Sequence, residues 1–272
     1  MQHHIQFVTR FDTVSLTPDG AAAAAGRAVP VEAPVALSFF GIGYAVMMAT
    51  PADLEDFATG FALSERLIGH IGELVRVDVR PADQGLLLDI ELAPDRREHV
   101  FDRVRVRVGE SSCGLCGIEN LEQALRPLPR VGCPPAIEAK SLFRALETIR
   151  AHQPLNADTG AVHAAAFFDG SGALVAARED VGRHNALDKL VGHCLRGGVD
   201  MSGGFALLTS RCSYELVEKA ALAGFPMLVT VSAPTSLAVE RAHEAGLTLI
   251  ALARADSMLV MADPHGLFAA GR

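Results

Sequence analysis

The sequence predicts an α/β protein with βαβ units in the second half of the chain and a smaller, strand-rich part in the first half. Three short apolar runs, at 205–209, 227–231 and 248–252, are separated by helical patterns at 213–223 and 236–245. Strands that alternate with helices of this length form parallel sheets with right-handed crossovers. The first half instead carries short apolar runs broken by glycines, which is typical of hairpins.

The composition indicates that the chain can bury a large core, and it argues against two classes of partner. The chain has 272 residues, of which 50% are hydrophobic, so it can bury a substantial core. Its net charge of -8 argues against a general nucleic-acid or anionic-membrane surface, because such surfaces need clustered Lys and Arg. The uncharged stretch at 33–49 is shorter than the roughly 20 apolar residues that a spanning helix needs. Since residues 1–6 do not read as a secretory signal, we expect a cytoplasmic protein.

A hairpin and a helix are expected early in the first half. Apolar runs at 35–40 and 44–48 flank a glycine-rich turn, which predicts two buried strands. Thr50 supplies a hydroxyl for an N-cap, and Pro51 suits the first position of a helix. A helix is therefore predicted from there to about Ile68.

Three further strands are predicted before the first cysteine, at 75–79, 86–92 and 102–108. Valines alternate with arginines in 102–108, which indicates one buried and one solvated face. The alanine run at 21–25 is interpreted as a surface segment. Prolines between 127 and 135 indicate a linker, and we place a domain boundary there. The predicted domains are 1–135, which is strand-rich, and 136–272, which is α/β.

Two cysteines, Cys113 and Cys116, lie in a segment framed by glycines, ahead of a possible helix at 118–125. A thiol pair this close can bind a metal, cycle through a disulfide or carry sulfur as a persulfide. A structural zinc site needs four ligands, and the sequence has no second pair of this kind, so no metal site is predicted. The isolated cysteines are interpreted as small buried hydrophobes: Cys133, Cys194 and Cys212.

The residues alone leave both a redox pair and a persulfide carrier open. A thioredoxin-like pair belongs to a βαβ context, whereas the strands predicted before Cys113 lack a helical crossover. Zinc deaminase chemistry is unsupported, because that motif has a proline where Ser112 stands here. A flexible, glycine-rich setting suits a thiol that must meet more than one partner. We therefore favour the persulfide carrier.

The second half is predicted to open with a helix and two strands. The helix is expected at 142–149, and the strands are expected at 162–168 and 173–177 with a turn at 169–172 between them. The second strand leads into 178–185, which is interpreted as a dense polar turn.

The turns after the parallel strands are candidate binding sites, because ligands collect beyond the carboxyl ends of such strands. The first turn contains Arg211 and Ser213, the second contains Thr235, and Arg254 follows the third strand. Hydroxyls and free N–H groups at helix N-termini attract phosphate or carboxylate, although ordinary helix capping produces the same pattern. An anionic ligand and simple capping both remain open.

Seven segments match motifs of one known protein family and follow one another in the same order as in that family: Thr50-Pro51, Gly60-Phe61, Ser111–Gly117, Thr159–Ala165, Glu179–Lys189, Arg211–Glu215 and Ser232–Ala238. On these segments the chain resembles the formate dehydrogenase accessory sulfurtransferases, known as FdhD proteins. The resemblance implies transfer of sulfur from a cysteine desulfurase, through a protein persulfide, to the molybdenum or tungsten bis(molybdopterin guanine dinucleotide) cofactor of formate dehydrogenase. It also implies a cytidine-deaminase-like α/β core and a homodimer.

The resemblance also implies roles for individual residues. Cys113 matches the persulfide cysteine and Cys116 its companion. The implied cofactor-binding stretch consists of Leu252, Ala253, Arg254, Ala255, Asp256 and Ser257. A phosphorylated pterin dinucleotide suits the candidate anion site, which adds further candidate cofactor-binding residues: Arg211, Ser213, Thr235, Arg183 and His184. For His184, a hydrogen bond that braces the polar turn is the alternative.

Two other functions remain candidates. One is a protein that binds the pterin cofactor without transferring sulfur, for which the cysteines would matter little. The other is a dithiol oxidoreductase, which would exchange disulfides with an ordinary dithiol substrate.

Overall fold

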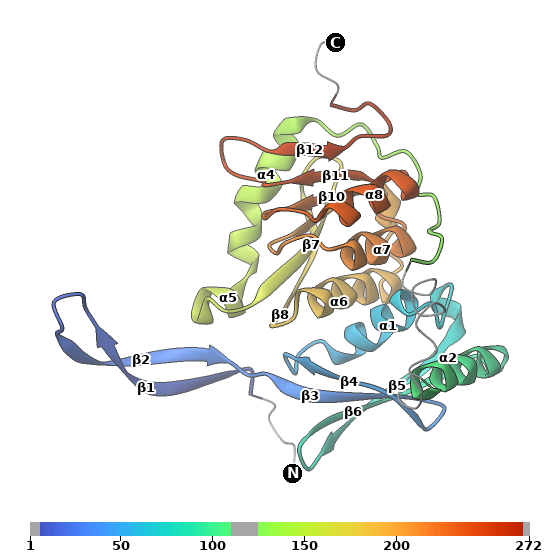
Figure 1. Cartoon of the computed structure of the whole chain (residues 1–272), viewed down its shortest axis with the longest axis horizontal. Helices are drawn as coiled ribbons and strands as arrows, with labels where there is room; N and C mark the ends of the chain where they lie inside the picture. The colour runs from blue at the N-terminus through green and yellow to red at the C-terminus, as the bar shows by residue number, and fades with distance from the viewer. Residues whose placement is uncertain (1–5, 110–124, 269–272) are drawn as a thin grey trace.

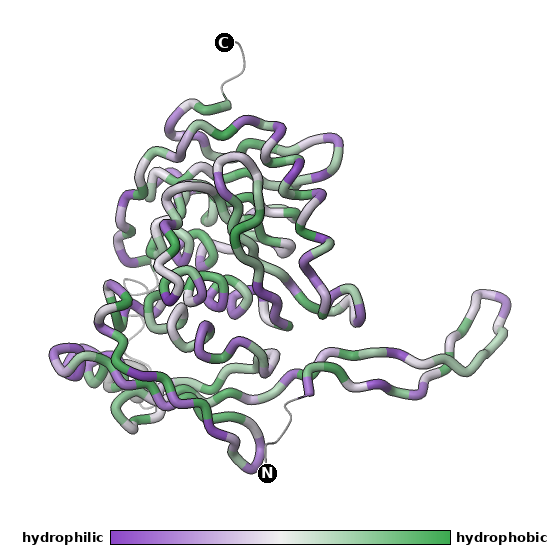
Figure 2. The backbone as a smooth tube through the Cα atoms, turned by 180° about the vertical axis from the view of Figure 1, so that it is seen from behind, coloured by the Kyte–Doolittle hydropathy of each residue, from purple (hydrophilic) through white to green (hydrophobic). Residues whose placement is uncertain are grey.

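The structure is a computed structural model that describes residues 6–109 and 125–268, and its strands form three sheets (Figure 1). A two-stranded antiparallel hairpin, β1 (Val8–Leu16) and β2 (Ala22–Pro30), projects away from the rest of the chain (Figures 1 and 2). In the described part of the chain, no helix combines the length and the apolar character needed to cross a membrane.

A four-stranded sheet follows the hairpin. Its order is β4 (Ile42–Ala49), β3 (Ala33–Phe39), β6 (Gly85–Leu92) and β5 (Leu74–Ala82). β3 and β6 are parallel, whereas the two outer pairings are antiparallel. α1 (Leu54–Ser64) connects β4 to β5, and α2 (Arg97–Gly109) follows β6.

The second half builds a six-stranded sheet. Its order is β12 (Leu259–Ala262), β11 (Thr248–Ala251), β10 (Met227–Thr230), β9 (Gly204–Leu208), β7 (His163–Asp169) and β8 (Leu174–Asp180). β9, β10 and β11 are parallel, and the remaining pairings are antiparallel. The helices are α4 (Ala139–Ile149), α5 (Pro154–Thr159), α6 (Arg183–Arg196), α7 (Tyr214–Ala223) and α8 (Ser236–Ala245). Short 3₁₀ turns occur at 71–73, 94–96, 150–152 and 201–203.

Hydrophobic packing joins the two larger sheets through a layer of helices. One cluster of buried residues includes Leu37 and Leu88 from the four-stranded sheet and Leu208 and Leu249 from the six-stranded sheet. A second cluster lies on the other face of the six-stranded sheet, beneath α4. Figure 2 shows hydrophobic residues gathered along these central strands. The six-stranded sheet is therefore covered on both faces, as parallel strands require.

α1 and α6 approach each other very closely at two glycines. A Cβ atom added to Gly60 would lie 1.8 Å from the carbonyl oxygen of Asp188, and one added to Gly192 would lie 1.9 Å from that of Asp56. Only a residue without a side chain fits at such a distance. The Gly60-Phe61 segment of the sequence thus has a packing role.

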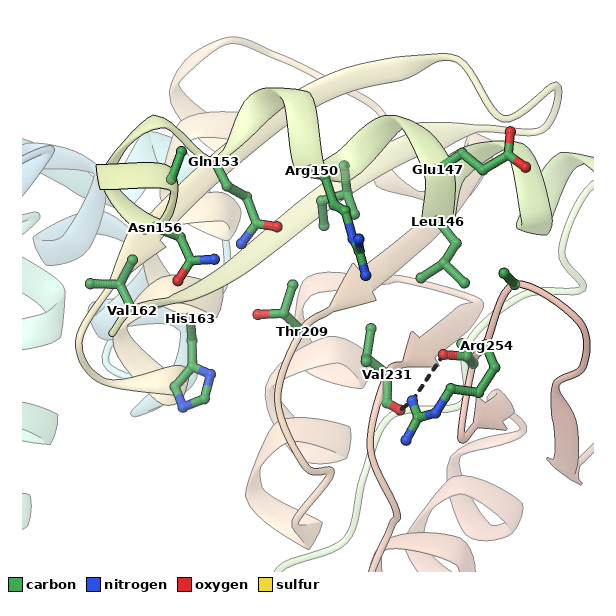
Figure 3. A pocket seen from close by; sticks show the side chains of 14 residues that line it. Leu146, Glu147, Arg150, Gln153, Asn156, Val162, His163, Thr209, Val231 and Arg254 are labelled. Atoms are coloured by element: carbon green, nitrogen blue, oxygen red, sulfur yellow. Dashed lines mark hydrogen bonds between the residues drawn. The ribbon is translucent and has the colours of Figure 1, made fainter. Parts of the chain in front are cut away.

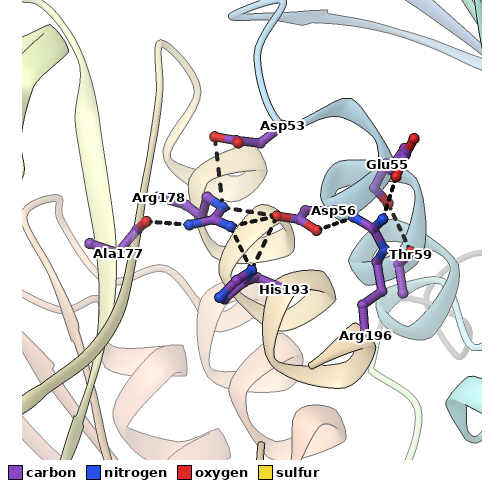
Figure 4. Close-up of polar contacts among 8 residues, drawn as sticks. All are labelled: Asp53, Glu55, Asp56, Thr59, Ala177, Arg178, His193 and Arg196. Carbon is purple, nitrogen blue, oxygen red and sulfur yellow. Dashed lines mark hydrogen bonds and ion pairs between the residues drawn. The ribbon is translucent and has the colours of Figure 1, made fainter. Parts of the chain in front are cut away.

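Ion pairs reinforce the same helix contact (Figure 4). Asp56 of α1 is 4% exposed and accepts hydrogen bonds from Arg178 Nε at 2.9 Å and from Arg196 Nη1 at 2.5 Å. His193 Nδ1 lies 2.6 Å from Arg178 Nη2 and accepts from it. Charge-assisted hydrogen bonds of this kind satisfy a carboxylate that burial removes from water.

The α/β class and most of the predicted elements are confirmed. The strands at 35–40, 44–48, 75–79 and 86–92 correspond to β3, β4, β5 and β6. The helices at 142–149, 213–223 and 236–245 are present, and the three parallel strands are β9, β10 and β11. The cytidine-deaminase-like core and the domain boundary at 135 stay predictions.

The strand predicted at 102–108 is wrong, because these residues belong to helix α2. The alternation of valine and arginine has period two, but Val100, Phe101 and Val104 also follow helical spacing. Val100 is completely buried, and Phe101 and Val104 pack against the core. The contacts of the helix face therefore outweigh the strand-like pattern.

The predicted N-cap at Thr50 is also wrong. The helix begins at Leu54, and the residue before it, Asp53, has a left-handed backbone and caps nothing with its side chain. The Thr50 hydroxyl instead accepts a hydrogen bond from the amide of Val181 at 3.1 Å. Thr50 therefore ties the start of the helix segment to the second half of the chain.

Two other expectations need correction, and a third is confirmed. The polar stretch at 178–185 is the end of β8 followed by the first turn of α6, and is not one long turn. Cys133 is exposed, whereas Cys194 and Cys212 are buried as expected. The alanine run at 21–25 is on the surface, but most of it lies within β2.

Candidate functional site

Cys113 and Cys116 lie outside the described residues, as does most of the helix expected at 118–125. The described chain ends at Gly109 after α2 and resumes at Leu125. Burial raises the pKa of Cys194 to about 11 and that of Cys212 to about 12. Both therefore stay protonated at neutral pH and are poor nucleophiles.

A cavity of about 1040 Å³ opens where the parallel strands end (Figure 3). Thr209, Val231 and Ala253 line it from the turns that follow β9, β10 and β11. Its opposite wall comes from the end of α4 and from α5. The cavity thus lies at the edge of the sheet where the sequence predicted a ligand.

The stretch at 252–257, to which the resemblance assigns cofactor binding, contributes to one side of this cavity. Ala253, Arg254 and Ala255 line it, and Leu252 adopts a left-handed backbone that turns the chain there. The Arg254 guanidinium donates to the backbone carbonyls of Val231 and Ala253, and its own amide donates to the carbonyl of Ser257 at 2.8 Å. These bonds fix one cationic side chain at the cavity wall.

Asp256 and Ser257, the last two residues of this stretch, are exposed and do not line the cavity. The hydroxyl of Ser257 lies 3.3 Å from a carboxylate oxygen of Asp256. The two residues therefore contact each other at the cavity edge.

Several polar residues of the cavity were not predicted as site residues, among them Arg150, Gln153, Asn156 and Thr209. They come from the corner between α4 and α5 and from the residue after β9. The Thr209 hydroxyl accepts a hydrogen bond from the amide of Ala164 at 2.9 Å. The sequence signal was weak, because the first three lie where α4 ends and α5 begins, and polar residues are ordinary between two helices.

His163 also lines the cavity and connects it to two predicted residues. Burial lowers the pKa of His163, and the nearby guanidinium groups of Arg183 and Arg211 lower it further. His163 is therefore neutral near pH 7. Arg183 and Arg211 do not line the cavity, but their charges reach its histidine.

The remaining predicted residues form a second cluster where α6 and α7 begin. His184 Nε2 lies 3.0 Å from Glu215 Oε2 and 3.3 Å from the hydroxyl of Ser213. Burial lowers the pKa of His184, and Glu215 opposes that shift. His184 thus braces the starts of two helices, which matches the alternative given for it.

Thr235 has a role in helix structure. Its hydroxyl accepts a hydrogen bond from the amide of Ala238 at 3.2 Å, which caps α8. Ser213 occupies the corresponding position of α7, but its side chain does not cap the helix. Helix capping is therefore observed at one of the two turns.

A buried ion pair holds the segment that carries Arg183 and His184. Asp180 and Lys189 have fully buried side chains, and their charged atoms are 2.6 Å apart. Asp180 also accepts from the amide of Gly182 at 2.7 Å, from the side-chain amide of Asn185 at 3.0 Å and from the amide of Thr50 at 3.0 Å. The start of α6 is thereby fixed against the first half of the chain.

Within residues 6–109 and 125–268, no group of three or more His, Cys, Asp and Glu side chains is arranged to hold a metal ion. The cavity contains one acidic residue, Glu147, against the basic residues Arg150 and Arg254. Its donor set therefore suits an organic anion better than a bare cation.

Comparison with known proteins places the chain in a family. The FdhD/NarQ family model matches residues 30–268. The chain belongs to the FdhD/NarQ family. Sulfur carrier protein FdhD of Xanthomonas euvesicatoria pv. vesicatoria (strain 85-10) is 46% identical over 255 residues, covering 94% of this chain and 91% of that protein. Its namesake in Bordetella bronchiseptica is 40% identical over 252 residues, covering 92% and 91%.

A solved structure supports the same assignment of this FdhD/NarQ family member. The crystal structure of a proposed formate dehydrogenase accessory protein from Desulfotalea psychrophila superposes with a TM-score of 0.73 at 25% identity. The match covers 96% of this chain and 99% of that one. The family resemblance found from sequence motifs is confirmed.

Proposed function

We propose that the protein is a sulfur carrier, which takes persulfide sulfur from a cysteine desulfurase and passes it to a molybdenum or tungsten bis(molybdopterin guanine dinucleotide) cofactor. The recipient of the cofactor is formate dehydrogenase, and the transfer takes place in the cytoplasm. The observation that carries the proposal is the family match over residues 30–268, which includes the Cys113 and Cys116 pair. Relatives at 46% and 40% identity bear the name of sulfur carriers.

The chemistry requires a nucleophilic thiolate. In the loading step the Cys113 thiolate attacks the terminal sulfur of the donor's persulfide, the donor's S–S bond breaks, and the donor leaves as a thiolate. Cys113 then holds the extra sulfur as a persulfide. In the release step the Cys116 thiolate attacks the inner sulfur of Cys113, which forms a disulfide and frees the outer sulfur as sulfide for the acceptor.

The other cysteines are poor candidates for this role. Cys194 and Cys212 are buried, and their raised pKa values keep them as thiols. Cys133 is exposed, so it is the described cysteine that a sulfur donor could reach. It lacks a second cysteine nearby in sequence, which the release step uses.

The cavity fits the proposed acceptor. A pterin dinucleotide combines flat rings with phosphates, and the cavity combines apolar walls with the cationic side chains of Arg150 and Arg254. Its volume of about 1040 Å³ is ample for a large ligand. Arg254 with its neighbours Ala253 and Ala255, together with His163 and Arg150, would hold the cofactor. The cofactor's metal is the acceptor of the sulfur.

A cofactor-binding chaperone without sulfur transfer is the second candidate, because the cavity alone would serve it. Genetic complementation separates the two. In a strain that lacks its own copy, the sulfur carrier predicts that Cys113→Ala fails to restore formate dehydrogenase activity, whereas Cys133→Ala restores it. Full activity with Cys113→Ala would instead support the chaperone. Rapid reduction of insulin by the wild type would support the dithiol oxidoreductase.

We also propose that the protein is a homodimer with a cytidine-deaminase-like core, as the resemblance implies. The projecting hairpin of β1 and β2 exposes Phe11, Val14 and Leu16, which are 52%, 64% and 76% exposed. An isolated hairpin is only marginally stable in water, so contact with a second chain would favour its structure. Light scattering should give twice the mass of the 28.7 kDa chain. A monomer mass at micromolar concentration would contradict the dimer.

A further inference from the structure

A second, smaller cavity also borders α5 and has no role in the function proposed above. We call it the hairpin pocket, because the first residues of the projecting hairpin form part of its wall. Its volume is about 400 Å³, which is large enough for a small ligand or for a side chain of another protein. Most of its wall is apolar and comes from the hairpin, the turn before α1, α5 and β8: Phe7, Val8, Ala52, Pro154, Leu155 and Ala177.

Glu179 brings a carboxylate to the hairpin pocket without a cation to balance it. Its two carboxylate oxygens accept hydrogen bonds from the backbone amides of Leu155 at 2.9 Å and of Asn156 at 2.8 Å. No basic side chain in the described part of the chain forms an ion pair with it. Burial raises the pKa of Glu179, because the two amides offset only part of the lost hydration. A cation in the pocket would favour the charged carboxylate.

Asp53 supplies a second carboxylate from the turn between β4 and α1. Its backbone is left-handed, with φ 51° and ψ 40°, and its side chain does not cap α1. The side chain is 43% exposed, and its carboxylate makes no hydrogen bond with any described residue. Its ion-pair contact with Arg178 Nε is long, at 3.7 Å (Figure 4). Asp53 is therefore open to a closer cation.

Arg178 lines the hairpin pocket, but its guanidinium is directed to other groups. Nε and Nη2 both donate to the carboxylate of Asp56, at 2.9 and 2.8 Å, and Nη1 donates to the carbonyl of Ala177 at 2.8 Å. His152, the other basic residue of the wall, is exposed. The pocket thus combines apolar walls with two carboxylates that have no close cation. This combination is complementary to a side chain with an apolar stem and a cationic end.

The surroundings of the hairpin pocket favour a protein segment over a free amine. Phe7 lines the pocket and is 43% exposed, and Phe11 and Val29 of the same hairpin are 52% and 38% exposed. Exposed apolar surface of this kind is typical of contacts with other proteins. Pro154 and Leu155 of α5 line this pocket, whereas the next two residues of α5 line the larger cavity. A docked partner would therefore contact a helix that both cavities share.

We propose that the hairpin pocket binds a lysine side chain presented by a partner protein. The four-carbon stem of the lysine packs against the apolar wall, and its ammonium group lies at the carboxylates of Asp53 and Glu179. An ammonium carries three donor hydrogens on one atom, so two carboxylates from different elements can share it. The planar fork of an arginine instead matches a single carboxylate. The inference goes beyond sulfur carriage and does not depend on it.

Titration of the purified full-length protein with short peptides, followed by two-dimensional NMR, tests the proposal. The probes are acetyl-leucyl-lysine amide and acetyl-leucyl-norleucine amide, which differ only in the ammonium group. The wild type and the control Asp83→Asn, whose residue is exposed in the turn between β5 and β6, should bind the lysine peptide about 10-fold more tightly. Asp53→Asn should weaken binding of the lysine peptide by about 3- to 10-fold and leave the norleucine peptide unaffected. Asparagine suits this variant because it tolerates the left-handed backbone.

The positions of the shifted signals give a second readout, which decides the matter if Asp53→Asn does not fold. On the wild type, the lysine peptide should shift the amide signals of Asp53, Leu155 and Glu179 more than those of Thr209 and Ala253 in the larger cavity. The proposal is overturned if the wild type does not prefer the lysine peptide, if Asp53→Asn keeps the wild-type preference, or if the largest shifts lie in the larger cavity. n-Butylamine should bind more weakly than the lysine peptide. Equal binding of the free amine would overturn the assignment to a protein partner.

Discussion

Buried polar groups have partners at the contact between α1 and α6, whereas the cavity beside α4 contains polar groups without partners among the described residues. Asp56 at the helix contact, and the nearby pair of Asp180 in β8 and Lys189 in α6, have their charges matched by neighbours at hydrogen-bonding distance. In the cavity, the described structure offers no partner to the amide of Gln153 and no carboxylate to Arg150. Buried polar groups therefore maintain the fold in the first region and are available to a ligand in the second.

The largest expected effect comes from breaking the buried pair. Lys189→Met removes the cation and leaves the Asp180 carboxylate in the interior, which should lower the free energy of unfolding by about 3–5 kcal/mol. Urea unfolding followed by circular dichroism measures the change. The control is Lys140→Met, since Lys140 forms an exposed ion pair with Glu138 and should change stability by at most about 0.5 kcal/mol. Equal losses for both variants would contradict the account.

A second test adds a methyl group to the helix contact. Gly60→Ala would place a Cβ atom 1.8 Å from the carbonyl of Asp188, so α1 and α6 would have to separate. We expect a loss of about 1–3 kcal/mol in the free energy of unfolding, measured with the same urea series. Gly43→Ala is the matched control, because an added Cβ meets nothing within 4 Å there. A neutral Gly60→Ala would show that the helices are not in tight contact.

Removal of a polar side chain from the cavity should, by contrast, change the free energy of unfolding little. Gln153→Ala removes an amide that has no partner among the described residues, so stability should stay within about 0.5 kcal/mol of the wild type or rise slightly. Thermal unfolding without ligand measures this effect. A saturating ligand should then stabilise the wild type more than the variant, because stabilisation follows affinity. A large loss of stability without ligand would mean that Gln153 serves the fold.

The smallest expected effect concerns pH. The pKa of His163 is lowered in the folded state, mainly by burial, from its ordinary value of 6.5. As pH falls through 6.5, the unfolded chain therefore takes up a proton that the folded chain does not, and stability declines. Urea titrations between pH 7.5 and 5.5 should show a shallower decline for His163→Gln than for the wild type. An unchanged slope would indicate that His163 is not perturbed.

The sequence predicted the elements that depend on local patterns and missed those that depend on distant contacts. The parallel strands and the helices between them follow from apolar periodicity, and their carboxyl edge does carry the cavity. Thr50 was misplaced because its partner, Val181, is 131 residues away. Helix α2 was missed because valines alternate with arginines from Arg103 to Val108 as they would in a strand, whereas Val100 and Val104 lie on one helix face against the core.

The candidate site was predicted in part for the same reason. Arg254 and its neighbours follow directly from the resemblance, and they do line the cavity. Gln153 and Asn156 had no motif to mark them, because their role depends on how the corner between α4 and α5 meets the sheet. His184 and Ser213 were grouped with the cavity, but they face each other at the starts of α6 and α7.

Sulfur carriage by Cys113 is measured by intact mass after reaction of the protein with a cysteine desulfurase and cysteine. The protein should carry the Cys133→Ala change, which removes the cysteine that is exposed among the described residues. The account predicts a gain of about 32 Da for one sulfur atom, removable by a reducing agent, and no gain when Cys113→Ala is added. An unchanged mass in the parent, or the same gain without Cys113, would contradict it.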